Sequence, residues 1–304
     1  MTRTNGLRIG TAPDSWGVWF PSDPAQVPWA RFLDEAAGAG YTWIELGPYG
    51  YLPTDPHQLA DELGSRGLKL AGGTVFTGFH KSPEERERAW AQAVKVAGLA
   101  SSLDAQHIVV IPDLWRSDAT GENLEPRTLT NEQWRTLAEG HDWLGKALLE
   151  EYGVKQQFHS HADSHVGTAR EVNRFLDETD PRYTNLCLDT GHFAYYGGDS
   201  LALIGERPDR IGYLHLKQVD QTKLFDVLKN DMSFKDAVAD GIMIEPPQGI
   251  PELGPIIEAA AAISSDIFAI VEQDMYGCEV DHPYPIARRT REHIHACTHL
   301  ARQF

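Results

Sequence analysis

Four side chains that bind metals in many proteins follow four successive predicted strands in the second half of the chain. They are the first His of Phe-His-Ser-His, the Asp of Asp-Thr-Gly-His, the His of Leu-His-Leu-Lys and the Glu of Val-Glu-Gln-Asp, that is, His159, Asp189, His215 and Glu272. Taken singly, the Asp could cap a loop and a strand histidine could lie hydrogen-bonded in the core. Four equivalent positions in consecutive units are hard to obtain from packing. Imidazole and carboxylate groups in this ratio suit Mn²⁺, Co²⁺, Fe²⁺ or Zn²⁺, so the spacing predicts a divalent-metal site.

Further basic side chains lie close to these candidate ligands in the sequence. Because side chains along a strand alternate between its two faces, His161 shares a face with His159, and Lys217 shares one with His215. His192 closes the Asp-Thr-Gly-His run. A bound metal with His161, His192 and Lys217 beside it would combine Lewis-acid chemistry with proton transfer.

Three other residues are candidates for contacting a substrate. Glu45 and Asp113 end other predicted strands, and Trp16 follows the first one. Trp16 and the nearby Trp19 offer aromatic faces that could stack on the apolar side of a sugar ring, although packing in the core or in a lid explains them equally well. Glu45 could instead pair with an arginine. Histidines away from the strand ends, His80 among them, are expected to be structural or exposed.

Strand-like and helix-like segments alternate along the whole chain. Strands are expected over residues 7–11, 41–46, 68–75, 107–111, 154–161, 185–189, 211–216 and 267–272. Helices are expected over residues 29–39, 57–66, 83–103, 131–152 (capped by Thr130), 168–176, from 200, 256–263 and 286–302. Such alternation means parallel strands joined by crossover helices. Eight units predict an α/β fold, a single (β/α)8 TIM barrel forming one catalytic domain over residues 1–304, with chemistry at the C-terminal ends of the strands.

One stretch fits no regular element. Residues 220–254 follow the seventh predicted strand and include the run Pro-Pro-Gln-Gly-Ile-Pro. An irregular excursion of this length is often a functional loop, so we expect it to border the active site.

Composition narrows the class of partner. With 304 residues and 41% hydrophobic residues, the chain can bury a full core. Its net charge of −17 repels nucleic acid and acidic membrane surfaces, and no apolar run approaches the length of a membrane span. The 3 cysteines form no Cys-x-x-Cys pair, which is typical of a reducing compartment. We expect a cytoplasmic protein that acts on a small molecule.

The motifs resemble those of the sugar phosphate isomerase/epimerase superfamily, the xylose-isomerase-like barrels. The run Asp189 to His192 looks like that family's Asp-Thr-Gly-His, and the run Arg210 to Lys217 resembles its Arg-(Ile/Val)-x-x-x-His-x-Lys. Glu272-Gln-Asp is similar to the Glu-Gln-Asp that follows the family's last strand. The resemblance runs through most of the chain and is densest from residue 158 to residue 215.

The resemblance implies a divalent ion, with Mn²⁺ the first expectation and Co²⁺ the next, held at the positions of His159, Asp189, His215 and Glu272. Many epimerases of the superfamily have Glu where this chain has His159, and use a pair of Glu residues for proton exchange. The resemblance is therefore nearer to the branch that dehydrates keto-inositols in inositol catabolism. That branch has three successive histidines where this chain has His-Ser-His, and an Asp where this chain has Gln218.

These features predict a metal-dependent lyase that acts through an enolate on a keto-polyol such as a 2-keto-inositol. His161 or Glu272 would take the α-proton, and His192 or Lys217 would protonate the leaving oxygen. A sugar isomerase or epimerase, or a β-eliminating lyase or lyase subunit acting on 3-keto glycosides, would share the enolate. A non-catalytic sugar-binding subunit would not need four intact ligands, and an endonuclease would need a basic groove. The sequence is compatible with a homo-oligomer and with a complex that contains a small partner subunit.

Overall fold

Eight parallel strands close into a barrel in the computed structural model, which describes residues 7–264 and 266–300. Each strand pairs with its neighbours in chain order, and the last strand pairs with the first, with Arg8 opposite Phe268 and Thr11 opposite Val271. The strands are β1 Arg8–Thr11, β2 Trp43–Glu45, β3 Lys69–Thr77, β4 His107–Pro112, β5 Lys155–His159, β6 Thr184–Asp189, β7 Ile211–Leu216 and β8 Phe268–Val271. The expected closed (β/α)8 barrel is confirmed.

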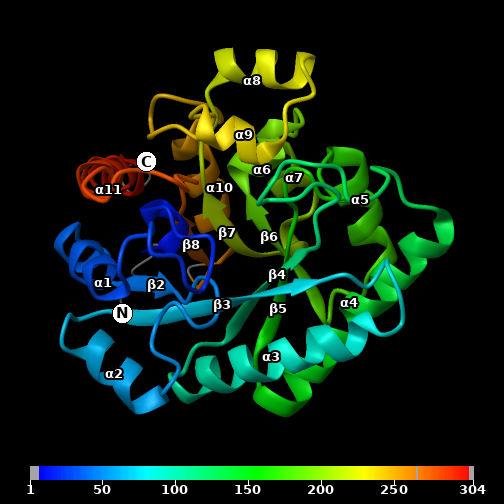
Figure 1. The fold of residues 1–304 in the computed structure, drawn as a ribbon, viewed down its shortest axis with the longest axis horizontal. Helices are drawn as coiled ribbons and strands as arrows, with labels where there is room; N and C mark the ends of the chain where they lie inside the picture. Colours follow the sequence, from blue (N-terminus) through cyan, green and yellow to red (C-terminus); the bar gives the residue numbers. More distant parts are fainter. Residues whose placement is uncertain (1–6, 265, 301–304) are drawn as a thin grey trace.

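Helices surround the barrel and alternate with its strands (Figure 1). They are α1 Trp29–Gly38, α2 Pro56–Gly64, α3 Glu85–Ser102, α4 Asn131–Tyr152, α5 Ala169–Glu178, α6 Thr190–Tyr195, α7 Ser200–Glu206, α8 Gln221–Lys229, α9 Phe234–Ala239, α10 Leu253–Ile263 and α11 Pro283–Leu300. α4 has the expected bounds because Thr130 and Gln133 form a reciprocal capping box at its start. The last two residues of the closing helix expected over 286–302 lie outside the described residues.

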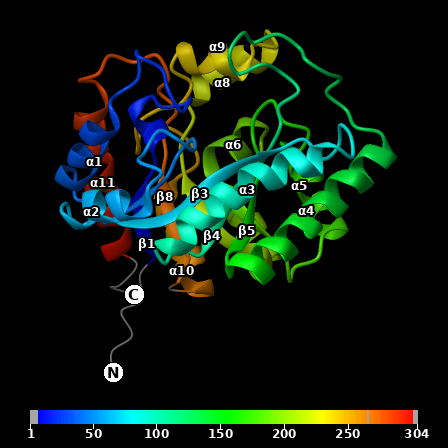
Figure 2. The ribbon, with the colours of Figure 1, turned by 60° about the horizontal axis from the view of Figure 1, so that its bottom comes forward.

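The stretch expected to be irregular contains two helices, so that expectation is wrong. The side chain of Asp220 accepts the amide hydrogens of Thr222 and Lys223 and starts α8, and that of Ser233 accepts from Asp236 and starts α9. Only the connection from α9 to α10 lacks a helix. Both helices lie together at one end of the barrel, where the connection from β4 to α4 also rises (Figure 2).

Buried side chains fill the barrel and the space between its strands and helices. The interior cluster includes Ala71, Val109, Cys187, Tyr213 and Ile270, which come from five different strands. Burial raises the pKa of the Cys187 thiol to about 12, so this residue is an inert part of the core. Within the described residues, no helix has both the length and the apolarity needed to cross a membrane.

Candidate active site

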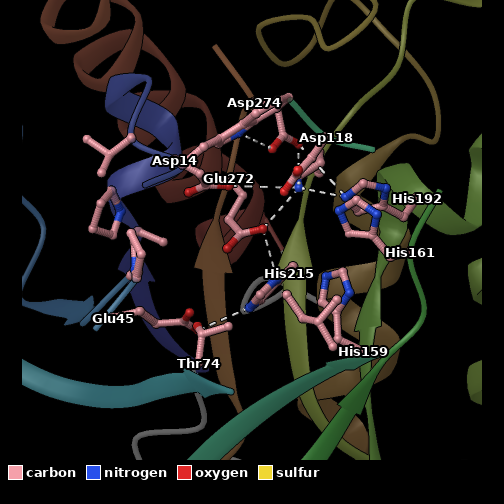
Figure 3. A pocket seen from close by; sticks show the side chains of 18 of the residues that line it. Asp14, Glu45, Thr74, Asp118, His159, His161, His192, His215, Glu272 and Asp274 are labelled. Carbon is pink, nitrogen blue, oxygen red and sulfur yellow. Dashed lines mark hydrogen bonds and ion pairs between the residues drawn. The ribbon is translucent and has the colours of Figure 1, made fainter. Parts of the chain in front are cut away.

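The four candidate ligands meet at the C-terminal end of the barrel. His159 and Asp189 are the last residues of β5 and β6, His215 is the last but one of β7, and Glu272 directly follows β8. All four are buried, and one potential ligand atom from each lies within 4.8 Å of the others. Nε2 of His159 is 3.3 Å from Oδ2 of Asp189. The strand register brings the ligands together, because Asp189 is paired with His215 and His215 is paired with Ile270, two residues before Glu272. Figure 3 shows the side chains of His159, His215 and Glu272 converging.

The geometry of His215 fits a bound cation. Its Nε2–H donates to Oε1 of Glu45 at 3.0 Å, as metal-bound histidines usually donate their second nitrogen to a carboxylate. Its Nδ1 then faces Oε2 of Glu272 at 2.8 Å and Oδ2 of Asp189 at 3.7 Å. Lone pairs this close require a proton or a metal ion. Although burial opposes charge on the ring, the carboxylates of Glu272 and Glu45 hold the pKa of His215 well above its usual range.

Glu45 therefore has a partner that the sequence did not indicate. It was expected to touch the substrate or to pair with an arginine. Its carboxylate pairs with His215, from the side away from the other candidate ligands, and because it also lines the cavity the substrate contact stays a prediction. The two residues are 170 positions apart in the chain. We infer that Glu45 is a positioning residue for the candidate metal ligand.

Replacing Glu45 by Gln should weaken divalent-metal affinity by about 10- to 100-fold, the usual effect of losing a carboxylate behind a metal-bound histidine. The amide preserves the shape of the side chain but not its charge. Titration of the chelator-stripped protein with Mn²⁺ or Zn²⁺ measures the change. Glu150→Gln, on an exposed part of α4, is the matched control and should leave the affinity unchanged. Equal affinities for the Glu45→Gln variant and the unmodified protein would show that Glu45 does not act through His215.

The ammonium group of Lys217 lies among four carboxylates of the site. Its ammonium lies 2.8 Å from Asp274, 3.0 Å from Glu272, 3.1 Å from Asp189 and 3.9 Å from Asp14. Burial alone would lower the pKa of Lys217, but these carboxylates hold it well above its usual range. Burial likewise opposes ionisation of Glu272, yet His215 and Lys217 lower its pKa to about 2. Lys217 and Glu272 are therefore both charged at neutral pH.

The Asp-Thr-Gly-His run positions this lysine. The side chain of Asp189 caps α6 by accepting the amide hydrogen of His192 at 2.8 Å. Thr190 donates its hydroxyl to the carbonyl of Lys217 at 2.6 Å. A Cβ on Gly191 would lie 2.7 Å from Cγ of Lys217, so only glycine admits the lysine stem. The motif thus supplies a candidate ligand and fixes the neighbouring strand end.

Two uncharged imidazoles stand above the candidate ligands (Figure 3). The rings of His161 and His192 lie 3.8 Å apart, centroid to centroid. His161 donates its Nδ1–H to the carbonyl of Ala162 at 2.6 Å, which leaves Nε2 as the proton acceptor. Burial and the nearby His159 lower the pKa of His161 to about 3. Burial, His161 and Lys217 likewise hold the pKa of His192 well below its usual range.

These groups line a cavity whose far wall is aromatic. The cavity measures about 820 Å³ including its open mouth, which is room enough for a cyclic polyol. Trp19 and Phe234 belong to its lining, with their rings nearly parallel at 17° and 6.3 Å apart. Tyr276 stacks on Trp19 at 4.9 Å. Trp19 also donates its indole N–H to Asp274 at 3.2 Å, which joins the aromatic wall to the charged floor.

The expectation that Trp16 contacts a substrate is wrong. Trp16 is fully buried, packs edge-on against Phe32 at 4.9 Å and donates its indole N–H to Glu35 on α1. Gly17, with φ of 72°, ends the short 3-10 helix Pro13–Trp16 and redirects the chain, so that Trp19 reaches the cavity instead.

Asp113 does not line the cavity either, which corrects the second substrate expectation. Lys81 holds its carboxylate at 2.8 Å and Arg88 holds it at 2.7 Å. Despite burial, these two cations lower the pKa of Asp113. Asp113 therefore ties the connection after β4 to the segment that follows β3.

Sequence reasoning missed Asp14, Asp118 and Phe234, which also line the cavity. Asp14 follows β1 by three residues, and the rule used for the other strand ends would have found it. Burial and the charge on Glu272 raise the pKa of Asp14 well above its usual range. Phe234 begins α9, inside the stretch expected to be irregular, so no signal pointed to it.

The chain matches the xylose isomerase-like TIM barrel family over residues 33–295. It is 30% identical over 303 residues to an inosose dehydratase of Geobacillus kaustophilus, with 97% of this chain and 96% of that protein covered. An inosose dehydratase of Clostridium perfringens is 27% identical over 303 residues, with 97% and 99% covered. Among solved structures, the IolI protein with a bound zinc atom shares the fold, with a TM-score of 0.70, 16% identity, and 96% of this chain and 99% of that chain covered.

Proposed function

This chain belongs to the xylose isomerase-like TIM barrel family, and we propose that within it the protein is a divalent-metal-dependent dehydratase of a keto-polyol such as a 2-keto-inositol. One observation carries the proposal: the buried cluster of His159, Asp189, His215 and Glu272 lies at the floor of a cavity of suitable size. Similarity to inosose dehydratases over nearly the whole chain supports the same substrate class. The acidic net charge argues against a nucleic-acid substrate, and the free cysteines fit a cytoplasmic location.

The two imidazoles and two carboxylates of this cluster would hold the ion. A bound divalent ion would act as a Lewis acid that polarises the substrate ketone and stabilises the enolate formed when the α-proton leaves. We propose Mn²⁺, since carboxylate and imidazole ligands suit it, while Zn²⁺, Co²⁺ and Fe²⁺ accept the same ligands.

His161 is the proton acceptor in this proposal. It lines the cavity, its neutral ring presents Nε2 as a base, and Ala162 fixes that tautomer. Glu272, the other candidate base, is occupied by His215 and Lys217. His161 would take the proton from the carbon next to the ketone, and the electron pair of that C–H bond would move into the enolate.

Lys217 is the proton donor. Its pKa is raised, so it carries a proton at neutral pH, whereas His192 is held uncharged. Lys217 would protonate the hydroxyl on the β-carbon as the C–O bond breaks, and water would leave with the electron pair of that bond. The elimination then balances: the substrate loses one H from the α-carbon and one OH from the β-carbon.

Replacing His161 by Gln should lower kcat by about 10²- to 10⁴-fold, the usual contribution of a general base. The metal content should not change, because His161 is not among the four candidate ligands. Steady-state kinetics and metal analysis of the same sample separate the two quantities. The exposed His282 provides a control, and His282→Gln should keep full activity. Undiminished turnover of His161→Gln would assign the base to another group.

Incubation with scyllo-inosose and Mn²⁺ in D₂O, followed by mass spectrometry, tests the function itself. Loss of 18 mass units supports the dehydratase, and exhaustive chelation should abolish that loss. Deuterium uptake without loss of water would replace the proposal by an isomerase or epimerase. Neither change, in a protein shown to contain metal, would contradict an inosose-type substrate.

A further inference from the structure

A second cluster of metal-binding side chains lies outside the cavity. One potential ligand atom from each of His80, Glu125 and His165 lies within 4.8 Å of the others, and none of the three is among the residues that line the active-site cavity. They come from three connections at the C-terminal end of the barrel, which follow β3, β4 and β5. His80 and His165 are each only 3% exposed.

His165 is held in the form that binds a metal. Its Nε2 lies 2.9 Å from the carbonyl of Pro126, and since a carbonyl can only accept, the proton is on Nε2. Nδ1 of a neutral ring then carries a lone pair. This nitrogen is buried and has no hydrogen-bond partner within the described chain. Histidines that bind a metal through one ring nitrogen usually donate the N–H of the other nitrogen to a carboxylate or a backbone carbonyl, as His165 does.

His80 faces the carboxylate of Glu125 directly, so its Nε2 is the nitrogen that could share a cation with Glu125. Its Nε2 lies 3.0 Å from Oε2 of Glu125, and its Nδ1 is likewise buried without a partner in the described residues. The rings of His80 and His165 are 4.6 Å apart. Two buried imidazoles beside a carboxylate, with one potential ligand atom of each residue within 4.8 Å of the others, form a donor set that suits a cation.

We propose that His80, Glu125 and His165 bind a second divalent cation, with Zn²⁺ the best match to two imidazoles and one carboxylate. Lys81 does not fill this position, because its ammonium approaches the other carboxylate oxygen, Oε1 of Glu125, at 3.4 Å. The site is separate from the proposed catalytic metal and goes beyond the dehydratase function.

Its role would be to fasten the connection between β4 and α4. Glu125 lies on that connection, which also supplies Leu114 and Asp118 to the cavity lining. A cation would join Glu125 to the segments that follow β3 and β5. Occupancy of the second site would therefore hold one wall of the active-site cavity in place.

Metal analysis in a variant without the first site tests this proposal independently of turnover. Asp189→Asn, stripped with a chelator, reloaded with Zn²⁺ and gel-filtered, should retain about one Zn²⁺ per chain, and Zn²⁺ should raise its Tm. Adding His165→Gln should remove both the ion and the Tm shift. Glu125→Gln provides a second test on a side chain that is 18% exposed and so less prone to unfold the protein.

His282→Gln in the same background is the matched control for surface imidazoles and should leave the bound Zn²⁺ unchanged. No Zn²⁺ in Asp189→Asn would overturn the proposal. Zn²⁺ that persists after both His165→Gln and Glu125→Gln would also overturn it, because the ion would then lie elsewhere. Neither readout depends on the substrate, so the dehydratase assignment can fail while the second site stands.

Discussion

Replacement of Asp189 by Asn is expected to remove the metal from the first cluster and to lower kcat by about 10³-fold or more. Asp189 touches His159, His215 and Lys217 at 3.3, 3.7 and 3.1 Å, so its charge holds the site together. Asn retains the volume and can still cap α6, but it is a poor ligand. Lewis-acid stabilisation supplies several kcal/mol, and each 1.36 kcal/mol corresponds to about a tenfold change in rate. Metal content and kcat should fall together.

Asp199 offers a matched control for this substitution. It also caps a helix, accepting the amide hydrogen of Ala202 at 3.0 Å, but it lies outside the cavity. Asp199→Asn should therefore keep both the metal and the activity. An Asp189→Asn protein that retained full activity after chelation would exclude a metal-dependent reaction at this site.

Lys217→Met is expected to lower the free energy of unfolding by about 3–5 kcal/mol at neutral pH, the cost of leaving buried opposite charges unpaired. The substitution keeps the apolar stem over Gly191 but removes the only ammonium that contacts Asp189, Glu272 and Asp274 among the described residues. Activity should fall by about 10²- to 10⁴-fold as the proton donor is lost. Denaturant unfolding of the metal-free proteins measures the stability change.

The stability difference should depend on pH in a defined direction. The folded-state pKa of Lys217 is raised, so its stabilising effect is complete below the ordinary lysine pKa of about 10.4 and is lost as the pH rises through the higher folded value. The pKa of Glu272 is lowered to about 2, so its contribution is complete above about 4.3 and is lost as the pH falls toward about 2. The effect of Lys217→Met should therefore shrink as the pH falls below about 4.

Lys146 provides the comparison for a solvent-exposed lysine. Its ammonium lies 3.9 Å from Glu150 on α4, and both side chains are more than half exposed. Lys146→Met should change the unfolding free energy by no more than about 0.5 kcal/mol at any of these pH values. A Lys217→Met effect of the same size would mean that the carboxylates of the site are not ionised around the lysine.

The barrel and the first cluster were predictable because both follow from periodicity. Alternating segments require parallel strands, and parallel strands bring His159, Asp189, His215 and Glu272 to one end of the barrel. The capping box at Thr130 is a purely local signal, which is why α4 was placed correctly.

The wrong predictions concern residues outside the strands and helices that were expected, where no sequence periodicity shows which way a side chain points. Trp16 and Trp19 differ by three residues, and a left-handed glycine between them decides which one enters the cavity. Asp113 follows a strand but turns toward Lys81 and Arg88. The caps at Asp220 and Ser233 were present in the sequence, yet the proline-rich run beyond them favoured an irregular loop.

The second cluster lay beyond sequence reasoning for a different reason. His80, Glu125 and His165 belong to connections rather than strands, so no register relates them. His80 was expected to be structural or exposed, and it is buried with an unsatisfied nitrogen. Only the folded arrangement brings the three side chains together.

The segment of α8 and α9 has a consequence for how this enzyme could change its substrate. Phe234 lies 5.1 Å from the ring of His161 and belongs to α9, which is inserted between β7 and β8 and supplies none of the four candidate ligands. Its amide hydrogen bonds to Asp163 at 2.7 Å and anchors the segment over the cavity. Mutations at Phe234 and its neighbours in α9 can therefore alter which ketone fits while the four candidate ligands stay in place. A library of variants restricted to these residues would change the wall of the cavity and leave the four candidate metal ligands unaltered.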